Sequence, residues 1–336
     1  MEKTYEMELA LEPEEVKEEE RVSKNVISWV FKNYKFLLLP GSRLEDLTQR
    51  EIEFERVRGK RKFIRRFKSV LTITGILIVF TVISFAVFCH WISPYTFEHA
   101  RGIFPGAWNQ PSPVHPLGQT ELGRDVLARL IFGAFSSLSV ALPAIMLSVI
   151  GGIAIGVIAA YYRGWIDSLL MRICDILLAF PGLILALVVI SIVGQQIQYI
   201  MIVWGILGIP YYSRLIRGNV LQARELPYIQ AARVSGAGNW RIMFRHILPN
   251  VIQPIIISFT FDVGSWVLGL AALSYLGFSD PNMIEWGNDI NFARTNLYSA
   301  PWASLWPGFM ILITVLGFML LGDGLRDALD PRLKNL

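Results

Sequence analysis

Long stretches without a single charged side chain divide this chain of 336 residues. No Asp, Glu, Lys or Arg occurs in residues 69–97, 130–162, 176–213 and 303–322. An uncharged apolar run of about 20 residues matches the hydrocarbon thickness of a bilayer. The elements of a large soluble core would instead be interrupted by solvated faces. The pattern therefore predicts an all-α polytopic membrane protein.

Six transmembrane helices are expected, at about residues 70–91, 135–161, 172–193, 197–214, 251–276 and 304–321. The run 176–213 is too long for one span, and its polar break Gly194-Gln195-Gln196 predicts the turn of a helical hairpin. One acid, Asp262, interrupts the fifth span.

Positive charge is distributed unevenly over the segments between the spans. If the N-terminus is cytoplasmic, residues 1–69, 162–172, 214–250 and 322–336 hold 16, 2, 6 and 3 of the 31 Lys and Arg. The outer loops hold the other four. Because Lys and Arg are enriched on the cytoplasmic side, both termini are predicted to be cytoplasmic in a cell-membrane protein. The net charge of +4 then reflects topology.

The first 69 residues form a predicted cytoplasmic tail of two parts, preceding a transmembrane domain at 70–336. Nine Glu fall within residues 1–20, which is typical of a solvated segment. Eight Lys and Arg fall within 56–68, directly before the first span. A basic cluster at this place favours binding to anionic membrane lipid over binding to nucleic acid, and we expect no nucleic-acid partner.

The cytoplasmic loop 214–250 is long and predicts two short helices. Pro227 suits the first turn of one helix, which Gly236-Ala237-Gly238 ends. Asn239 is expected to cap a second helix over 240–247, which Pro249 ends. A helix–turn–helix with small residues on one side suits contact with a partner.

The same loop resembles the EAA loop of permeases of ATP-binding-cassette (ABC) importers. Ala231, Ala232, Gly236, Leu248 and Pro249 match that motif in register, and Gln230 replaces its Glu. Three further stretches resemble the C-type subunit of dipeptide and oligopeptide permeases. They are His115-Pro116-Leu117-Gly118 with Glu121–Asp125, residues 167–186 with Leu-Leu-Ala-Phe-Pro-Gly, and Gly322–Arg332.

The resemblance covers about residues 70–336 and implies the type I ABC importer permease fold. It implies that this chain forms half of a translocation pathway with a second, B-type permease subunit. Two cytoplasmic ATPase subunits would bind the loop containing Gln230, Ala231, Ala232, Gly236, Leu248 and Pro249. An extracytoplasmic binding protein would deliver substrate. Peptides are the expected cargo, with oligosaccharides, nickel or glutathione as alternatives.

Enzyme chemistry has no basis in the sequence. No phosphate-binding Gly-x-x-x-x-Gly-Lys-Ser/Thr loop occurs, so ATP hydrolysis must belong to a partner. The four His show no metal-ligand spacing, and no Ser lies in a nucleophile elbow. We expect no catalytic residue, metal or cofactor. Glu121, Arg124 and Asp125 cluster before the second span, where a structural role is favoured.

Asp262 is the candidate residue of the translocation pathway. A charged Asp facing lipid at mid-membrane costs about 2.5 kcal/mol or more, so Asp262 should face a polar partner or the pathway. Ser258, Thr260 and Ser265 are candidate partners. A role in binding the positive group of a substrate is the alternative. The resemblance leads us to expect Glu at position 270, where this chain has Leu270.

Overall fold

The computed structural model describes residues 69–329, and every regular element in this range is helical. The predicted tail lies outside the described residues apart from Ser69, as do residues 330–336. In chain order the helices are α3 Val70–Val87, α4 Cys89–Ile92, α5 Phe97–Arg101, α6 Val126–Tyr162, α7 Gly164–Leu178, α8 Gly182–Val193, α9 Ile197–Ala223, α10 Pro227–Val234, α11 Asn239–Arg241, the π-helix η1 Ile242–Ile247, α12 Leu248–Val251, α13 Gln253–Tyr275, α14 Trp286–Ala293, the 3-10 helix η2 Arg294–Asn296 and α15 Trp302–Leu329.

Five described helices, α3, α6, α9, α13 and α15, are long and apolar enough to cross a membrane. They confirm the first, second, fourth, fifth and sixth predicted spans, although α6, α9 and α15 extend well past the predicted bounds. The predicted turn is also confirmed, because α8 ends at Val193 and Gly194 has a φ of 109°.

The third span departs from the straight helix expected over 172–193. Helices α7 and α8 form a broken pair bent by 85°, and α7 begins at Gly164, within the predicted loop. Pro181 precedes α8 and explains the break. Its nitrogen has no hydrogen to donate, and its ring would collide with a carbonyl of the preceding turn.

Small residues allow α6 and α9 to pack closely along their length. A Cβ added at Gly152 of α6 would overlap the side chain of Tyr212 on α9. One at Gly205 of α9 would lie 3.0 Å from the carbonyl oxygen of Ala144. Glycine at such contacts lets two backbones approach within a membrane, where no hydrophobic driving force brings helices together. This contact therefore requires residues without side chains.

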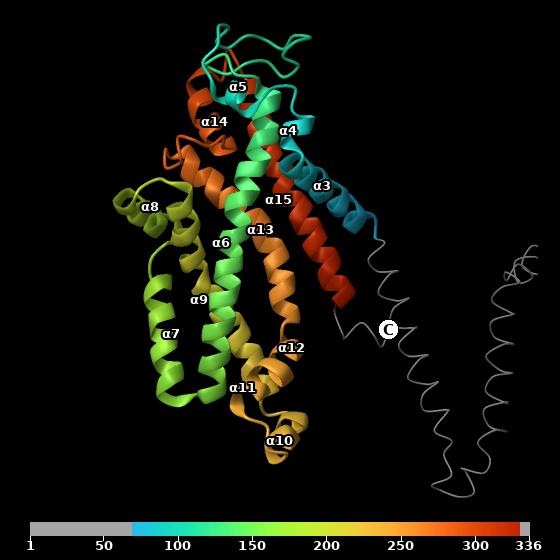
Figure 1. The fold of residues 1–336 in the computed structure, drawn as a ribbon, viewed down its shortest axis with the longest axis vertical. Helices are drawn as coiled ribbons and strands as arrows, with labels where there is room; N and C mark the ends of the chain where they lie inside the picture. Colours follow the sequence, from blue (N-terminus) through green and yellow to red (C-terminus); the bar gives the residue numbers. More distant parts are fainter. Residues whose placement is uncertain (1–68, 330–336) are drawn as a thin grey trace, which may run out of the picture. The chain divides into compact units, whose positions relative to one another are not determined.

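The loop segments lie at opposite ends of the long helices. Helix α10 lies at one end, where α6 ends and α7 begins, whereas α5 and α14 lie at the other end (Figure 1). We call these the α10 end and the α14 end. Between these two ends, helix α15 packs against both α3 and α13.

Candidate functional site

Helix α10 starts and stops as the loop sequence predicts. Pro227 occupies its first turn after Leu226, and Gly236 follows its end with a φ of 80°. Glycine populates positive φ without strain, which explains the residue at this turn. Of the eight residues in α10, only Ile229 is buried, with no exposed surface. Ile229 is therefore the main side chain that attaches this helix to the rest of the molecule.

The second helix of the loop differs from the prediction at both ends. Asn239 is its first residue and Gly238 is the N-cap, so Asn239 does not cap it. Pro249 does not end it, because the chain continues through η1 into α12, with Pro249 in the first turn of α12. A helix start leaves its first N–H groups without intrahelical partners, so proline is tolerated there. The wider π turn before it permits this restart.

The residues expected to couple to an ATPase lie at the α10 end and are largely accessible. Gln230, Ala231, Gly236 and Pro249 are exposed, while Ala232 and Leu248 are partly buried. Large apolar side chains surround them: Val234 is 89% exposed and Trp240 is 66% exposed. We call seven of the exposed residues at this end the coupling surface: Tyr228, Gln230, Ala231, Val234, Gly236, Trp240 and Phe244. An exposed apolar patch next to small residues fits protein–protein contact.

Specific polar contacts connect the loop to the long helices. The hydroxyl of Tyr161, in the last turn of α6, donates to Oδ1 of Asn239 at 2.8 Å. Arg224 at the end of α9 donates to the carbonyl oxygens of Ala160 and Tyr161 at 3.0 and 2.9 Å. These are carbonyls of the last turn of α6, which have no partner within the helix. Sequence reasoning missed Tyr161 and Arg224, since only the fold brings them to the loop.

Apolar packing adds to these contacts. Ile229, Ile242 and Ile247 are fully buried and belong to one core cluster with Tyr161 and Val220 of the long helices. A displacement of the loop therefore acts directly on the ends of α6 and α9.

Ion pairs join α7 to α9 near the same end. Arg217 donates to both carboxylate oxygens of Asp167 at 2.7 Å. Arg214 donates to Asp175 at 2.6 Å in a more exposed pair. Two planar hydrogen bonds fix orientation as well as charge, so the Asp167 pair is the more specific link.

Asp262 lies within α13 and bonds to a neighbouring helix. Its Oδ2 accepts a hydrogen bond from the hydroxyl of Tyr212 on α9 at 2.6 Å. The three expected partners are not bonded to it: Ser258 lies 3.4 Å from Tyr211, and Thr260 donates to its own helix. The three expected partners lie on the same helix as Asp262, whereas the hydroxyl of Tyr212 reaches Asp262 from α9. Asp262 stays partly exposed, while Tyr212 is buried.

The α14 end is built around the start of α6. Asp125 caps α6 by accepting from the backbone N–H of Ala128 at 2.7 Å, and it lies 2.9 Å from Nδ1 of His115. This bears out a structural role for Asp125. Arg129 forms a buried ion pair with Asp289 of α14 and donates to the carbonyl oxygen of Ala100. The pair fastens α14 to α6.

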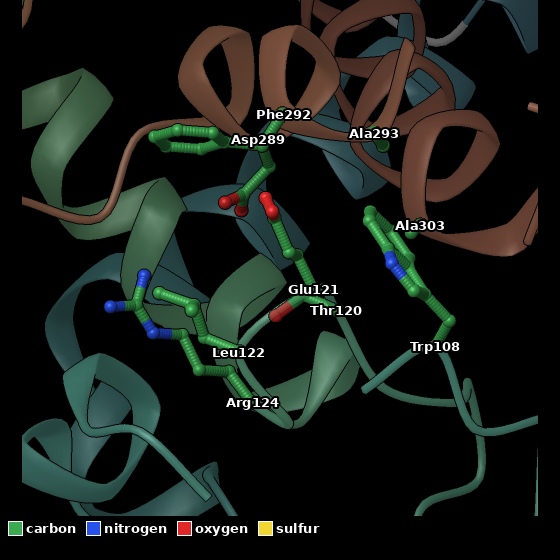
Figure 2. Close-up of a pocket in the computed structure, with 9 residues that line it drawn as sticks. All are labelled: Trp108, Thr120, Glu121, Leu122, Arg124, Asp289, Phe292, Ala293 and Ala303. Atoms are coloured by element: carbon green, nitrogen blue, oxygen red, sulfur yellow. The ribbon is translucent and has the colours of Figure 1, made fainter. Parts of the chain in front are cut away.

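A small pocket opens beside this ion pair (Figure 2). The carboxyl groups of Glu121 and Asp289 point toward each other, while Trp108 and Arg124 lie on opposite sides of them. Within residues 69–329 no ion pair joins Glu121 to an arginine. Nε of Arg124 donates instead to the carbonyl oxygen of Gly102 at 2.8 Å. Burial and the nearby Arg129 lower the pKa of Arg124.

The chain is similar to known transport proteins over most of its length. Residues 152–335 match the family described as binding-protein-dependent transport system inner membrane component. A glutathione transport system permease protein, GsiD, of Pectobacterium atrosepticum is 40% identical over 277 residues, which cover 82% of this chain and 92% of the relative. A dipeptide transport system permease protein, DppC, of Alkalihalophilus pseudofirmus is 40% identical over 269 residues, 80% of this chain and 88% of the relative. GsiD of Escherichia coli O6:K15:H31 is 41% identical over 276 residues, which cover 82% of this chain and 91% of that relative.

Proposed function

This chain belongs to the family of binding-protein-dependent transport system inner membrane components, and we propose that it imports short peptides as half of a translocation pathway. It is a membrane-spanning permease subunit of an ABC importer and not an enzyme, and separate ATPase subunits hydrolyse ATP. The relatives named for dipeptide and glutathione transport support the substrate class, since glutathione is itself a tripeptide.

The coupling surface is the proposed contact with one of two ATPase subunits. The observation that carries this is an accessible patch on a loop whose buried side chains, Ile229, Ile242 and Ile247, pack into one core cluster with residues of α6 and α9. Gln230, Ala231 and Gly236 offer little steric hindrance, and Val234 and Trp240 offer apolar area. Movement of a bound ATPase would reach the spans through Ile229 and the bond between Tyr161 and Asn239.

The other partners follow from the orientation that the Lys and Arg counts favour, with both termini cytoplasmic. The α10 end then faces the cytoplasm, and the α14 end meets the substrate-binding protein. The pocket in Figure 2 offers carboxylate and aromatic groups for that contact. A B-type permease subunit would complete the pathway.

Asp262 is proposed to face that pathway. A partly exposed acid within a span is costly against lipid, and a polar pathway removes this cost. The hydrogen bond from Tyr212 fixes the position of its carboxyl group and leaves one oxygen for a substrate. A peptide amino terminus has the positive charge that suits it.

Reconstitution with the partner subunits tests the substrate assignment. The complete importer in vesicles is given labelled dipeptide, glutathione, oligosaccharide or nickel, together with its binding protein. We expect ATP-dependent uptake of peptides. Uptake of oligosaccharide or nickel with peptides excluded would contradict the proposal.

Substitutions at Gly236 of the coupling surface and at the adjacent Ala232 test the partner assignment. Ala232→Glu and Gly236→Asp place a charge at the proposed ATPase contact, and burying an unpaired charge is strongly unfavourable. We expect loss of transport with the spans still folded. Wild-type transport by both variants would show that the ATPase binds elsewhere.

A further inference from the structure

A small cavity lies between the end of α13, the start of α9 and the loop that leads into α14. Its polar lining residues are Ser274, Ser279, Asp280 and Glu285, and its volume is about 10 Å³. This space holds about one water molecule. It lies outside the coupling surface and the pocket in Figure 2.

Two buried groups in this cavity have no bonded partner among residues 69–329. The Ser274 hydroxyl is fully buried and makes no hydrogen bond there. Glu285 is 4% exposed, and although it is the N-cap residue of α14, its side chain does not cap the helix. Buried polar groups are nearly always satisfied, so these two groups require a common explanation.

The charges around Glu285 leave it without a counter-ion. Asp289 lies one turn further along α14 and repels a second negative charge. Arg129, from α6, is already bonded to Asp289. Asp280, from the loop, accepts from the backbone N–H groups of Ile197 and Asn282. The α9 residues lining the cavity, Ile197 and Ile200, are apolar.

Such surroundings favour the neutral form of the acid. Burial raises the pKa of Glu285 from its ordinary value of 4.5 to about 8, and the charge of Asp289 acts in the same direction. A neutral carboxyl group has a hydrogen to donate and an oxygen to accept, which suits the Ser274 hydroxyl or a water between them.

We propose that Glu285 is a proton-binding site whose loss of the proton releases α14 from α13 and α6. The neighbours of Glu285, together with the Arg129–Asp289 pair, hold α14 in place. Ile284 and Trp286 are buried, and the Trp286 indole donates to the carbonyl oxygen of Leu130 on α6 at 3.1 Å. One water in the cavity does not replace the hydration shell of a carboxylate, so an ionised Glu285 must reach bulk water, which requires this packing to open. The external pH would thereby control one end of the chain, independently of the proposed substrate.

The direction and range of the effect follow from proton linkage. The open state, with a hydrated carboxyl group, loses its proton near the ordinary pKa of 4.5, whereas the closed state keeps it to about 8. The equilibrium constant for opening therefore rises about tenfold per pH unit between these values and levels off above pH 8. This profile distinguishes Glu285 from a group that begins to titrate at alkaline pH.

Thiol labelling of a buried α14 position measures this opening. In the full chain, Ala293→Cys is introduced after both native cysteines are replaced, Cys89→Ala and Cys174→Ala. Ala293 is 1% exposed, so labelling reports opening. The rate is divided by the rate in a Glu285→Gln background, which cancels the ionisation of the thiol itself. We expect the ratio to rise about tenfold per pH unit from pH 5 and to reach a plateau near pH 8.

Control variants keep the result decisive. Glu98→Gln removes an exposed acid of α5 at the same end and should leave the profile unchanged. Asp289→Asn removes the neighbouring negative charge, lowers the pKa of Glu285 and should move the plateau to lower pH. If Glu285→Gln fails to fold, the wild-type rate is divided by the Asp289→Asn rate instead, and this ratio should rise only between the lowered pKa of Glu285 and about pH 8. A ratio that is flat across pH 5 to 8, or a plateau unmoved by Asp289→Asn, would overturn the proposal. Both measurements use the chain without substrate, so failure of peptide transport would not affect them.

Discussion

Truncating Ile229 should uncouple ATP hydrolysis from transport. It is the only buried residue of α10 and has no exposed surface. Replacing a buried Ile by Ala costs about 2–5 kcal/mol, and by Val about 0.5–1.5 kcal/mol. An isolated helix of eight residues is not stable in water, so α10 depends on this contact. Ile229→Ala therefore removes much of what holds α10 against η1 and the core cluster.

The assay compares substrate uptake with ATP hydrolysis in vesicles that contain the assembled importer. We expect Ile229→Ala to lower the number of substrates imported per ATP, with Ile229→Val between it and wild type. Val234→Ala is the matched control: Val234 is 89% exposed, so its loss should weaken ATPase binding without changing that ratio. An unchanged ratio in an assembled Ile229→Ala importer would refute the reasoning.

Three further predictions concern the spans and their junctions. Gly152→Ala should separate α6 from α9, because its Cβ would overlap Tyr212, and thermal unfolding of the purified chain should show lower stability by about 1–3 kcal/mol. Asp262→Asn should reduce uptake of substrates with a free amino group while ATP hydrolysis continues, and equal uptake of every substrate would rule out a pathway role. Asp167→Asn should lower the thermal stability of the purified chain, because it removes the charge and one of the two oxygens that accept hydrogen bonds from Arg217 at the junction of α7 and α9. Equal thermal stability of Asp167→Asn and the wild type would contradict this.

The positions of the spans were predictable because a charged side chain is costly anywhere in the hydrocarbon core of a bilayer, so spans appear as uncharged runs. The hairpin turn at Gly194 was predictable for the same reason, since a polar break in a long apolar run is expected at the membrane surface. The bend between α7 and α8 was not, although Pro181 marks it, because proline within a span is often tolerated. Its effect depends on whether neighbouring helices satisfy the released carbonyls.

The candidate site was predictable only where local sequence determines it. Pro227 and Gly236 fix the bounds of α10 through backbone geometry, which the sequence displays. The bond between Tyr161 and Asn239 joins residues 78 positions apart. Likewise, Asp262 bonds across to Tyr212 rather than to a hydroxyl on its own helix. Such contacts depend on which helices pack together, and the sequence of a single span does not show this.

One continuous helix connects the two ends that partners are proposed to bind. Helix α6 has 37 residues, so it is about 55 Å long at 1.5 Å per residue. At the α14 end Asp125 caps it and Arg129 bonds to Asp289; at the α10 end Tyr161 bonds to Asn239. A movement of the loop 214–250 can therefore reach α14 without passing through any flexible connection. Pro143 is the one proline within α6, and a bend there could absorb the movement. The protonation of Glu285 then acts at the far end of the same path, where it sets how firmly α14 resists that movement.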